Sequence, residues 1–256
     1  MADVSKRKRK PKGTPHGGEF DKESDMADDL DLIYETETGA TNPLRTIKGL
    51  ARLLYRMGHT FDNLSTSQLN TEEFLRTGNP NVLTSKPDAD LLTDLKNASA
   101  FVLETDSDTI LDSDWVCAIN SRLTKTAAMK PGRIRVDGEP VGVNTIYGRY
   151  NPGTPDPAEL VDIMKQAERS ETNMFAASRM FARIARLQPF GDGNKRTAML
   201  AANGLLVKRS SPHMLAVPVE GRDKDVFLKG LSDWYMYKDP EVIAWLAEWN
   251  LTNPDD

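Results

Sequence analysis

One short segment of the sequence combines the residue types that bind a phosphate chain beside a metal ion. It spans residues 188–200 and reads Gln-Pro-Phe-Gly-Asp-Gly-Asn-Lys-Arg-Thr-Ala-Met-Leu. Gly193 can turn successive backbone amides toward one anion, and Lys195 and Arg196 add mobile positive charge close to those amides. Asp192 comes just before the amides, so its carboxylate can hold Mg²⁺ that bridges the same phosphates. The segment therefore predicts a phosphate site with a metal ion.

The same residue types also suit a purely structural loop between two core helices. In that interpretation Asp192 starts a helix and both bases are solvated. Phe190 would face inward in either case and anchor the turn. Spacing alone leaves both interpretations open.

Two predicted helices position this loop. In the first, apolar residues recur on one face, and Gln188 continues that stripe at the helix end. Pro189 should stop the helix because it lacks an N–H and restricts the residue before it. The second helix begins near Asn194, and its small residues permit close packing. The apolar stripe of the first helix consists of Met174, Ala177, Phe181 and Ile184.

Helical periodicity extends through most of the remaining sequence. Asn42 can cap a helix that contains Pro43 in its first turn and runs to Gly58. Further helices are expected at Ser67 to Leu75, from Asp88, at Ser113 to about Lys125, from Pro157, at Asp223 to Trp234 and at Pro240 to Asn250. The expected fold class is mainly α.

One predicted β-hairpin interrupts the helices and precedes the helix that carries the loop. It lies within Arg133 to Tyr150, where β-branched residues alternate around Asp137-Gly138, a strong turn signal. Pro140 limits the regularity of its pairing.

The N-terminal residues differ in composition from the rest of the 256-residue chain. Residues 1–12 carry a charge of +5, whereas the whole chain carries −5, so the remainder carries about −10. This acidic body argues against broad nucleic-acid binding. We expect residues 1–40 to form a disordered basic leader and residues 41–87 a helical appendage. The basic run in residues 1–12 lacks interleaved aromatic residues, but its bases suit contact with nucleic acid or with an acidic partner.

The sequence also bears on the cellular compartment. No window approaches the roughly 18 apolar residues of a membrane span, and no apolar stretch follows the charged N-terminus to make a signal peptide. We therefore expect a cytoplasmic protein without a membrane partner, or an effector secreted by a dedicated machine. Cys117 is the only cysteine, which excludes an intramolecular disulfide, and its apolar neighbours predict a buried thiol.

The loop resembles the signature of the Fic family, His-Pro-Phe-x-x-Gly-Asn-Gly-Arg-x-x-Arg, and that of its Doc relatives, His-x-Phe-x-Asp-Ala-Asn-Lys-Arg-Thr-Ala. The hairpin resembles the flap with which Fic enzymes align a target segment by strand addition. The helical order also fits, so residues 88–250 are expected to form a Fic/Doc-like (Fido) domain. The matching positions are Pro189, Phe190, Asp192, Gly193, Asn194, Arg196, Thr197 and Ala198, with Lys195 on the Doc side.

The resemblance implies a reaction and roles for the loop residues. Fic enzymes transfer AMP from ATP to a Ser, Thr or Tyr hydroxyl of a target protein (AMPylation), whereas Doc enzymes transfer the γ-phosphoryl group. ATP and Mg²⁺ would be the cofactors, and Asp192 would bind the metal. The backbone of Gly193, Asn194 and Lys195 would form the anion nest, and Arg196 would be the phosphate-binding catalytic residue. The expected partners are a target protein docked on the hairpin and an antitoxin or other regulator.

Two departures from the signature bear on activity. Gln188 stands where the family has the histidine that acts as general base, and a neutral amide cannot take a proton near pH 7. Met199 stands where Fic enzymes have their last arginine, a clamp for the distal phosphates, so nucleotide would be held less tightly. No inhibitory Ser/Thr-x-x-x-Glu-Gly/Asn motif is evident, so self-inhibition of the family kind is not expected. The chain has three histidines, and none has a sequence reason to reach the loop: His16, His59 and His213.

Three interpretations of Gln188 follow. The protein could be a weak or impaired transferase, either an adenylyltransferase or a Doc-like kinase, in which Gln188 orients the target hydroxyl. It could instead be a catalytically silent module that binds nucleotide or protein. In the third interpretation Gln188 only closes the apolar stripe of its helix.

Overall fold

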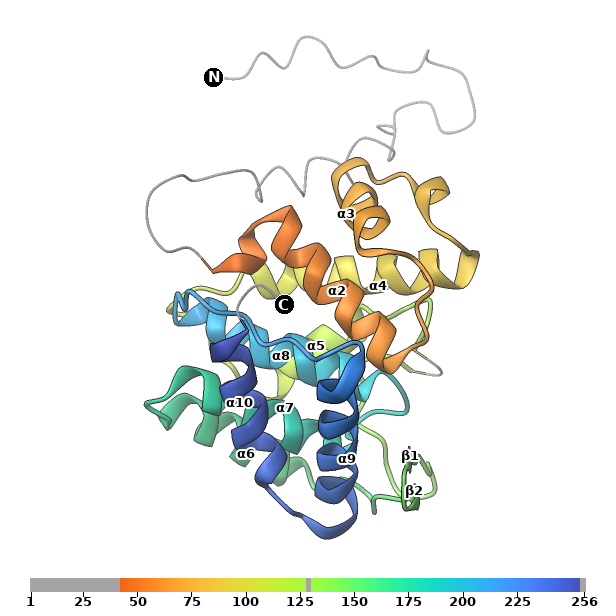
Figure 1. Ribbon diagram of the computed structural model, residues 1–256. Coiled ribbons are helices and arrows are strands. Elements are labelled where there is room, and N and C mark those ends of the chain that lie inside the picture. Colours follow the sequence, from red (N-terminus) through yellow and green to blue (C-terminus); the bar gives the residue numbers. More distant parts are fainter. Residues whose placement is uncertain (1–41, 128–129, 254–256) are drawn as a thin grey trace, which may run out of the picture.

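The computed structural model describes residues 42–127 and 130–253, and it is mainly helical with one small hairpin, as predicted (Figure 1). The basic leader predicted for residues 1–40 lies outside the described residues. The α-helices are α2 (Ile47–Phe61), α3 (Gln68–Thr77), α4 (Lys86–Leu103), α5 (Ser113–Ser121), α6 (Pro157–Arg169), α7 (Asn173–Leu187), α8 (Asn194–Lys208), α9 (Gly221–Tyr237) and α10 (Glu241–Thr252). Two 3-10 helices, η3 (Pro43–Arg45) and η4 (Pro80–Val82), precede α2 and α4.

The centre of the fold is the pair α7 and α8, the two helices that flank the loop (Figure 1). Helix α8 is buried on nearly all sides, as expected for a helix without a polar face. Helices α2, α4 and α5 pack against α8, whereas α6, α9 and α10 pack against α7. The loop between α7 and α8 is therefore fixed at both ends by core helices.

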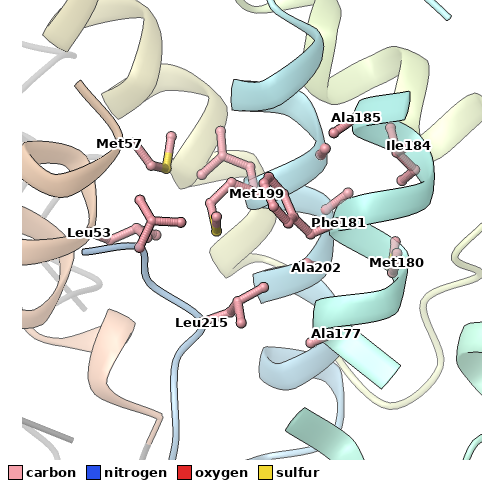
Figure 2. Close-up of a cluster of buried hydrophobic side chains, with 14 of the residues drawn as sticks. Leu53, Met57, Ala177, Met180, Phe181, Ile184, Ala185, Met199, Ala202 and Leu215 are labelled. Carbon is pink, nitrogen blue, oxygen red and sulfur yellow. The ribbon is translucent and has the colours of Figure 1, made fainter. Parts of the chain in front are cut away.

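The contact between α2, α7 and α8 places Met199 in the hydrophobic core. Its side chain is fully buried and lies in one cluster with Leu53 and Met57 of α2 and Phe181 of α7 (Figure 2). Close packing of this kind leaves no room for a charged side chain without a partner. The methionine at this position is thus a packing residue of the protein.

The structure corrects the predicted start of α2 and the predicted ends of α2 and α5. Asn42 caps η3, and it is Thr46 that caps α2 by accepting a hydrogen bond from the Gly49 amide. Helix α2 continues beyond the predicted end at Gly58 to Phe61. Helix α5 ends at Ser121 rather than near Lys125. The chain turns at Arg122 and Leu123, and the buried carboxylate of Asp94 then accepts hydrogen bonds from the backbone amides of Lys125 and Thr126.

The hairpin exists, but its turn lies elsewhere than predicted. Strands β1 (Val143–Thr145) and β2 (Gly148–Tyr150) pair antiparallel, so the turn is formed by Ile146 and Tyr147 rather than by Asp137-Gly138. Two local features explain the error. Val136 and Glu139 close a separate turn, in which the Glu139 carboxylate also accepts from the Val136 amide. Pro140, which has no N–H, then prevents this stretch from continuing into the ladder.

Two further expectations can be compared with the structure. Among the described residues, no helix has the length and apolar character needed to cross a membrane. Cys117 is only half-buried rather than buried, because α5 presents it at the edge of the core, and burial together with nearby Asp114 raises the pKa of its thiol. The division of the chain at residue 88 stays a prediction; the helix concerned begins at Lys86.

Candidate functional site

Gln188 ends α7 in a left-handed backbone conformation, with φ 50° and ψ 58°. This conformation is uncommon for a residue with a side chain, and surrounding contacts must hold it. Arg135 provides them: its Nε donates to the Gln188 carbonyl at 2.6 Å, and its backbone N–H donates to the Pro189 carbonyl at 2.9 Å. The buried Arg135 therefore fixes the turn that leaves α7.

The side chain of Gln188 turns back toward its own helix. It is 5% exposed, and its Nε2 donates to the carbonyl of Ala185 at 2.5 Å. The nearby Tyr235 hydroxyl cannot serve as a base in its place, because complete burial raises the pKa of that phenol and keeps it protonated.

The start of α8 has the features of an anion nest. Gly193 has φ 73°, and a Cβ at this position would lie 2.6 Å from Cδ1 of Leu123, so both backbone and space require glycine. None of the described side chains caps α8, and the amides of Asn194, Lys195 and Arg196 belong to its first turn. An uncapped helix N-terminus with such amides attracts an anion.

The side chain of Asn194 braces the loop and leaves only its backbone for a ligand. Its Oδ1 accepts from the Phe190 amide and its Nδ2 donates to the Phe190 carbonyl, both at 2.8 Å. Phe190 is completely buried, as predicted, and forms an isolated bridge with Ile134 on the segment before the hairpin. The loop is thus tied to both its own helix and the flap segment.

A second asparagine, Asn120 of α5, supports the loop and was not among the predicted site residues. Asn120 is 1% exposed, and its Nδ2 donates to the Asp192 carbonyl at 3.1 Å and to Oγ1 of Thr197 at 3.0 Å. Its Oδ1 accepts from the Gly132 amide at 2.7 Å. Lying at the end of an amphipathic helix, this residue gave no local signal of its role.

Arg196 is buried and paired rather than mobile or solvated. Its side chain is 5% exposed, with Nε 3.4 Å from Oδ1 of Asp62 and one terminal nitrogen 3.4 Å from Oδ1 of Asp192. The other terminal nitrogen donates to the Thr126 hydroxyl, which itself donates to the buried carboxylate of Asp94 at 2.7 Å. These contacts hold the guanidinium at the mouth of the nest.

Asp62 caps the C-terminal end of α2 and was not foreseen as a site residue. Burial raises the pKa of its carboxyl, although the charges of Arg196 and Lys195 lower it. Its Oδ2 has no hydrogen-bond partner within the described part of the chain. Asp62 reaches Arg196 from a helix that lies far away in the sequence, so no local sequence motif indicates this contact.

Lys195 is also less free than predicted. Its Nζ lies 5.0 Å from the ring centroid of Phe61, a cation–π contact with the last residue of α2. Burial lowers the pKa of its ammonium, and the charge of Asp62 opposes that effect. The lysine therefore lies between an aromatic ring and an acid, beside the first turn of α8.

Asp192 is the residue best placed for a metal ion. Its side chain is 44% exposed, and Oδ1 accepts from the Gly193 amide at 2.5 Å. Within residues 42–127 and 130–253, no group of three or more histidine, cysteine or acidic side chains could cage a metal. A single carboxylate suits Mg²⁺ that arrives bound to phosphates and keeps several waters. The residues present thus fit a phosphate-bound magnesium ion held by Asp192.

These groups share one cavity of about 490 Å³. The loop from Gly191 to Arg196 forms one wall and the end of α2 another. The hairpin and the residues that lead into it, the flap, line a further side with residues 140–144 and Arg149, and Gln188 also lines the cavity. The structure therefore brings together all the predicted site residues: Gln188, Asp192, Gly193, Asn194, Lys195 and Arg196.

The described histidines lie outside this cavity. His59 packs its ring 4.4 Å from that of Tyr55, and its Nε2 lies 3.4 Å from the Thr66 carbonyl. His213 is in the segment after α8, and His16 falls outside the described residues. Neither described histidine lines the cavity, in agreement with the sequence analysis.

Solved structures with the same fold carry Fic domains. A Fic domain containing signaling protein from Bacteroides thetaiotaomicron matches with a TM-score of 0.65 and 16% identity over 89% of this chain and 90% of that one. Fic-1 from C. elegans matches with a TM-score of 0.58 and 18% identity, covering 86% of this chain and 66% of that one. A Fic family protein from Desulfovibrio desulfuricans matches with a TM-score of 0.61 and 15% identity, covering 78% of this chain and 62% of that one. The present chain thus spans just under two thirds of the last two.

The sequence itself identifies the family over the central part of the chain. No curated protein matches the sequence. The family model described as the Fic/DOC family matches residues 110–206, which run from the segment before α5 through the flap, α6 and α7 into α8. The matched residues contain the loop and most of the cavity wall. Residues 110–206 therefore form a Fic/DOC family domain.

Proposed function

We propose that this protein binds ATP with Mg²⁺ and transfers AMP or a phosphoryl group from it, slowly, to a Ser, Thr or Tyr hydroxyl of a target protein. The observation that carries the proposal is the uncapped N-terminus of α8 opening into the same cavity as Lys195 and Arg196. Backbone amides, a helix N-terminus and two cations in one polar cavity suit a polyphosphate. The exposed edges of the β1–β2 hairpin beside this cavity suit a target segment added as a strand.

Each group of the site would have its own role in such a reaction. The amides of Asn194 and Lys195 would hold phosphate oxygens, joined by that of Gly193 once Asp192 turns from it to the metal, and Arg196 would stabilise charge on them. Asp192 would hold Mg²⁺, which neutralises phosphate charge when bound. Positioning and charge stabilisation supply most of the catalysis in phosphoryl transfer, so these groups can support a reaction without a base.

Gln188 limits the rate. An amide cannot accept the proton of the attacking hydroxyl, and a positioned general base contributes about 10²- to 10⁴-fold. One N–H of its Nε2 donates to the Ala185 carbonyl, so the amide oxygen and the second N–H are the groups that could orient a hydroxyl. Transfer of a phosphoryl group, whose transition state is loose, tolerates this loss better than a reaction that needs early deprotonation.

A second candidate function is a catalytically silent module that binds nucleotide or a partner protein. Two contacts favour it: Gln188 is turned toward its own helix, and Asp62 occupies one side of Arg196. An antitoxin or regulator as the partner, and contact of the basic leader with it or with nucleic acid, also remain proposals.

Labelled ATP separates these functions. We would incubate the full chain and Mg²⁺ in lysate with ATP labelled at the α- or the γ-phosphate, and compare the wild type with Gln188→His and Asp192→Ala. Protein labelling from α-labelled ATP indicates AMP transfer, and labelling only from γ-labelled ATP indicates kinase activity. Asp225→Ala, which removes an exposed acid on α9, is the matched control and should behave as the wild type.

The remaining outcomes decide between the two candidates. A silent wild type with an active Gln188→His variant supports the silent module, since the rest of the site is then competent. If all variants are inert and calorimetry detects no ATP binding to the wild type, the nucleotide site itself is refuted.

A further inference from the structure

The flap contributes a charged residue to the cavity. Arg149 is the central residue of β2, and its cross-strand partner is Asn144 of β1. It lines the cavity together with Gln188 and Asp192. It lies outside the loop motif, so the phosphate site described above does not use it.

The hairpin holds this guanidinium in place with neutral groups. Nε donates to Oδ1 of Asn151 at 3.2 Å, and a terminal nitrogen donates to Oδ1 of Asn144 at 3.4 Å. Gly142 makes room for it, because a Cβ there would lie 2.5 Å from Nε and 2.8 Å from Cζ of Arg149. The side chain is thus positioned against the start of β1 while its charge is not neutralised.

The other two cations that line the cavity, unlike Arg149, lie next to acidic side chains. Arg196 is paired with Asp62 and Asp192, and Lys195 is half-buried, with its ammonium over the Phe61 ring and its pKa affected by the charge of Asp62. Within the described parts of the chain, Arg149 forms no salt bridge. An anion entering the cavity therefore meets in Arg149 a cation that no acid already occupies.

We propose that Arg149 binds the polyphosphate chain of a nucleoside triphosphate from the flap side, opposite the anion nest at Gly193. A guanidinium presents a planar fork of donors that matches phosphate oxygens, and it is more weakly hydrated than an ammonium. The inference rests on the proposed nucleotide site and adds a second wall to it. Since Arg149 belongs to the strand proposed to align the target, nucleotide binding and flap position are coupled.

Binding measurements on the full chain test this role without relying on activity. We would titrate ATP and, separately, AMP into the wild type and Arg149→Gln by calorimetry in the presence of Mg²⁺. A charged hydrogen bond to phosphate corresponds to about a tenfold or larger loss of ATP affinity in the variant. AMP, which lacks the distal phosphates, should lose less than about threefold.

Two further variants make the test specific. Arg222→Gln removes an exposed cation of α9 and changes the net charge equally, so it should leave ATP affinity unchanged. Gly142→Ala keeps the charge of Arg149 but displaces the guanidinium, so it should also weaken ATP binding. Thermal unfolding monitored by circular dichroism checks that each variant folds.

The outcomes separate a failure of the role of Arg149 from a failure of the proposed function. If the wild type binds ATP and both Arg149→Gln and Gly142→Ala bind it equally well, the role of Arg149 is refuted while the proposed function stands. If Arg149→Gln and Arg222→Gln weaken ATP binding equally, the effect is one of net charge and the role is again refuted. If the wild type binds no ATP, the proposed function fails, and the role of Arg149 fails with it.

Discussion

The carboxylate of Asp62 at the end of α2 lies against the guanidinium of Arg196 near the start of α8, with Oδ1 3.4 Å from Nε. Both side chains line the cavity proposed for the phosphates. A phosphate that binds Arg196 must therefore compete with an acid that is already in place. The helical region before the Fic/DOC domain thus takes part in the site.

Replacing this acid should strengthen nucleotide binding. Asp62→Asn removes the negative charge but keeps the shape, so Arg196 becomes available to phosphate. We expect ATP affinity to rise about three- to tenfold, or about 0.7–1.4 kcal/mol, measured by calorimetry at pH 7. Asp225→Asn, an exposed acid of α9, is the control. Unchanged affinity in Asp62→Asn would mean that the pair does not oppose phosphate.

Gly193 should tolerate no side chain. In Gly193→Ala the new Cβ meets Leu123, and the residue must keep a φ of 73°. We expect a loss of about 1–3 kcal/mol in the free energy of unfolding, measured with urea, and a loss of ATP binding. Gly153→Ala is the matched control, because Gly153 has open space around its Cβ position, and it should change stability by less than about 0.5 kcal/mol. A Gly193→Ala variant as stable as the control contradicts the steric argument.

A histidine at position 188 should restore base catalysis. If the wild type transfers a group slowly, Gln188→His should raise the rate by about 10²- to 10⁴-fold. The imidazole accepts a proton only when neutral, so the rate should increase with pH through a pKa near about 6.5 and then level off. The wild type should lack this inflection. An accelerated variant with a flat pH profile would indicate that histidine acts by packing rather than as a base.

The charge of Lys195 should make phosphate binding sensitive to alkaline pH. Burial lowers the pKa of this ammonium, so it loses its proton at a lower pH than an exposed lysine does. ATP affinity should fall as pH rises through that lowered pKa. Lys195→Arg keeps its charge throughout and should bind ATP with little change over the same range. Parallel titration curves for the two proteins would exclude Lys195 as the titrating group.

Local patterns predicted the helices and the loop well because the interactions that define them lie within a few residues. Apolar periodicity and Pro189 placed the end of α7, and Ser67 and Gly78 mark α3 through capping. The hairpin turn was misplaced because Asp137-Gly138 is a strong turn signal in isolation. Only the pairing of Val143 with Tyr150 shows which turn joins the strands.

The sequence by itself determined the residue types along the loop and their order, including an amide, Gln188, at the end of α7. Only the tertiary structure decided which groups those residues meet. Arg196 pairs with Asp62, Asn120 holds the loop from α5, and Arg149 reaches the cavity from the flap. The physical reason is that a salt bridge or a cavity wall depends on distance in space, and helix packing brings together residues whose local sequence carries no sign of the contact.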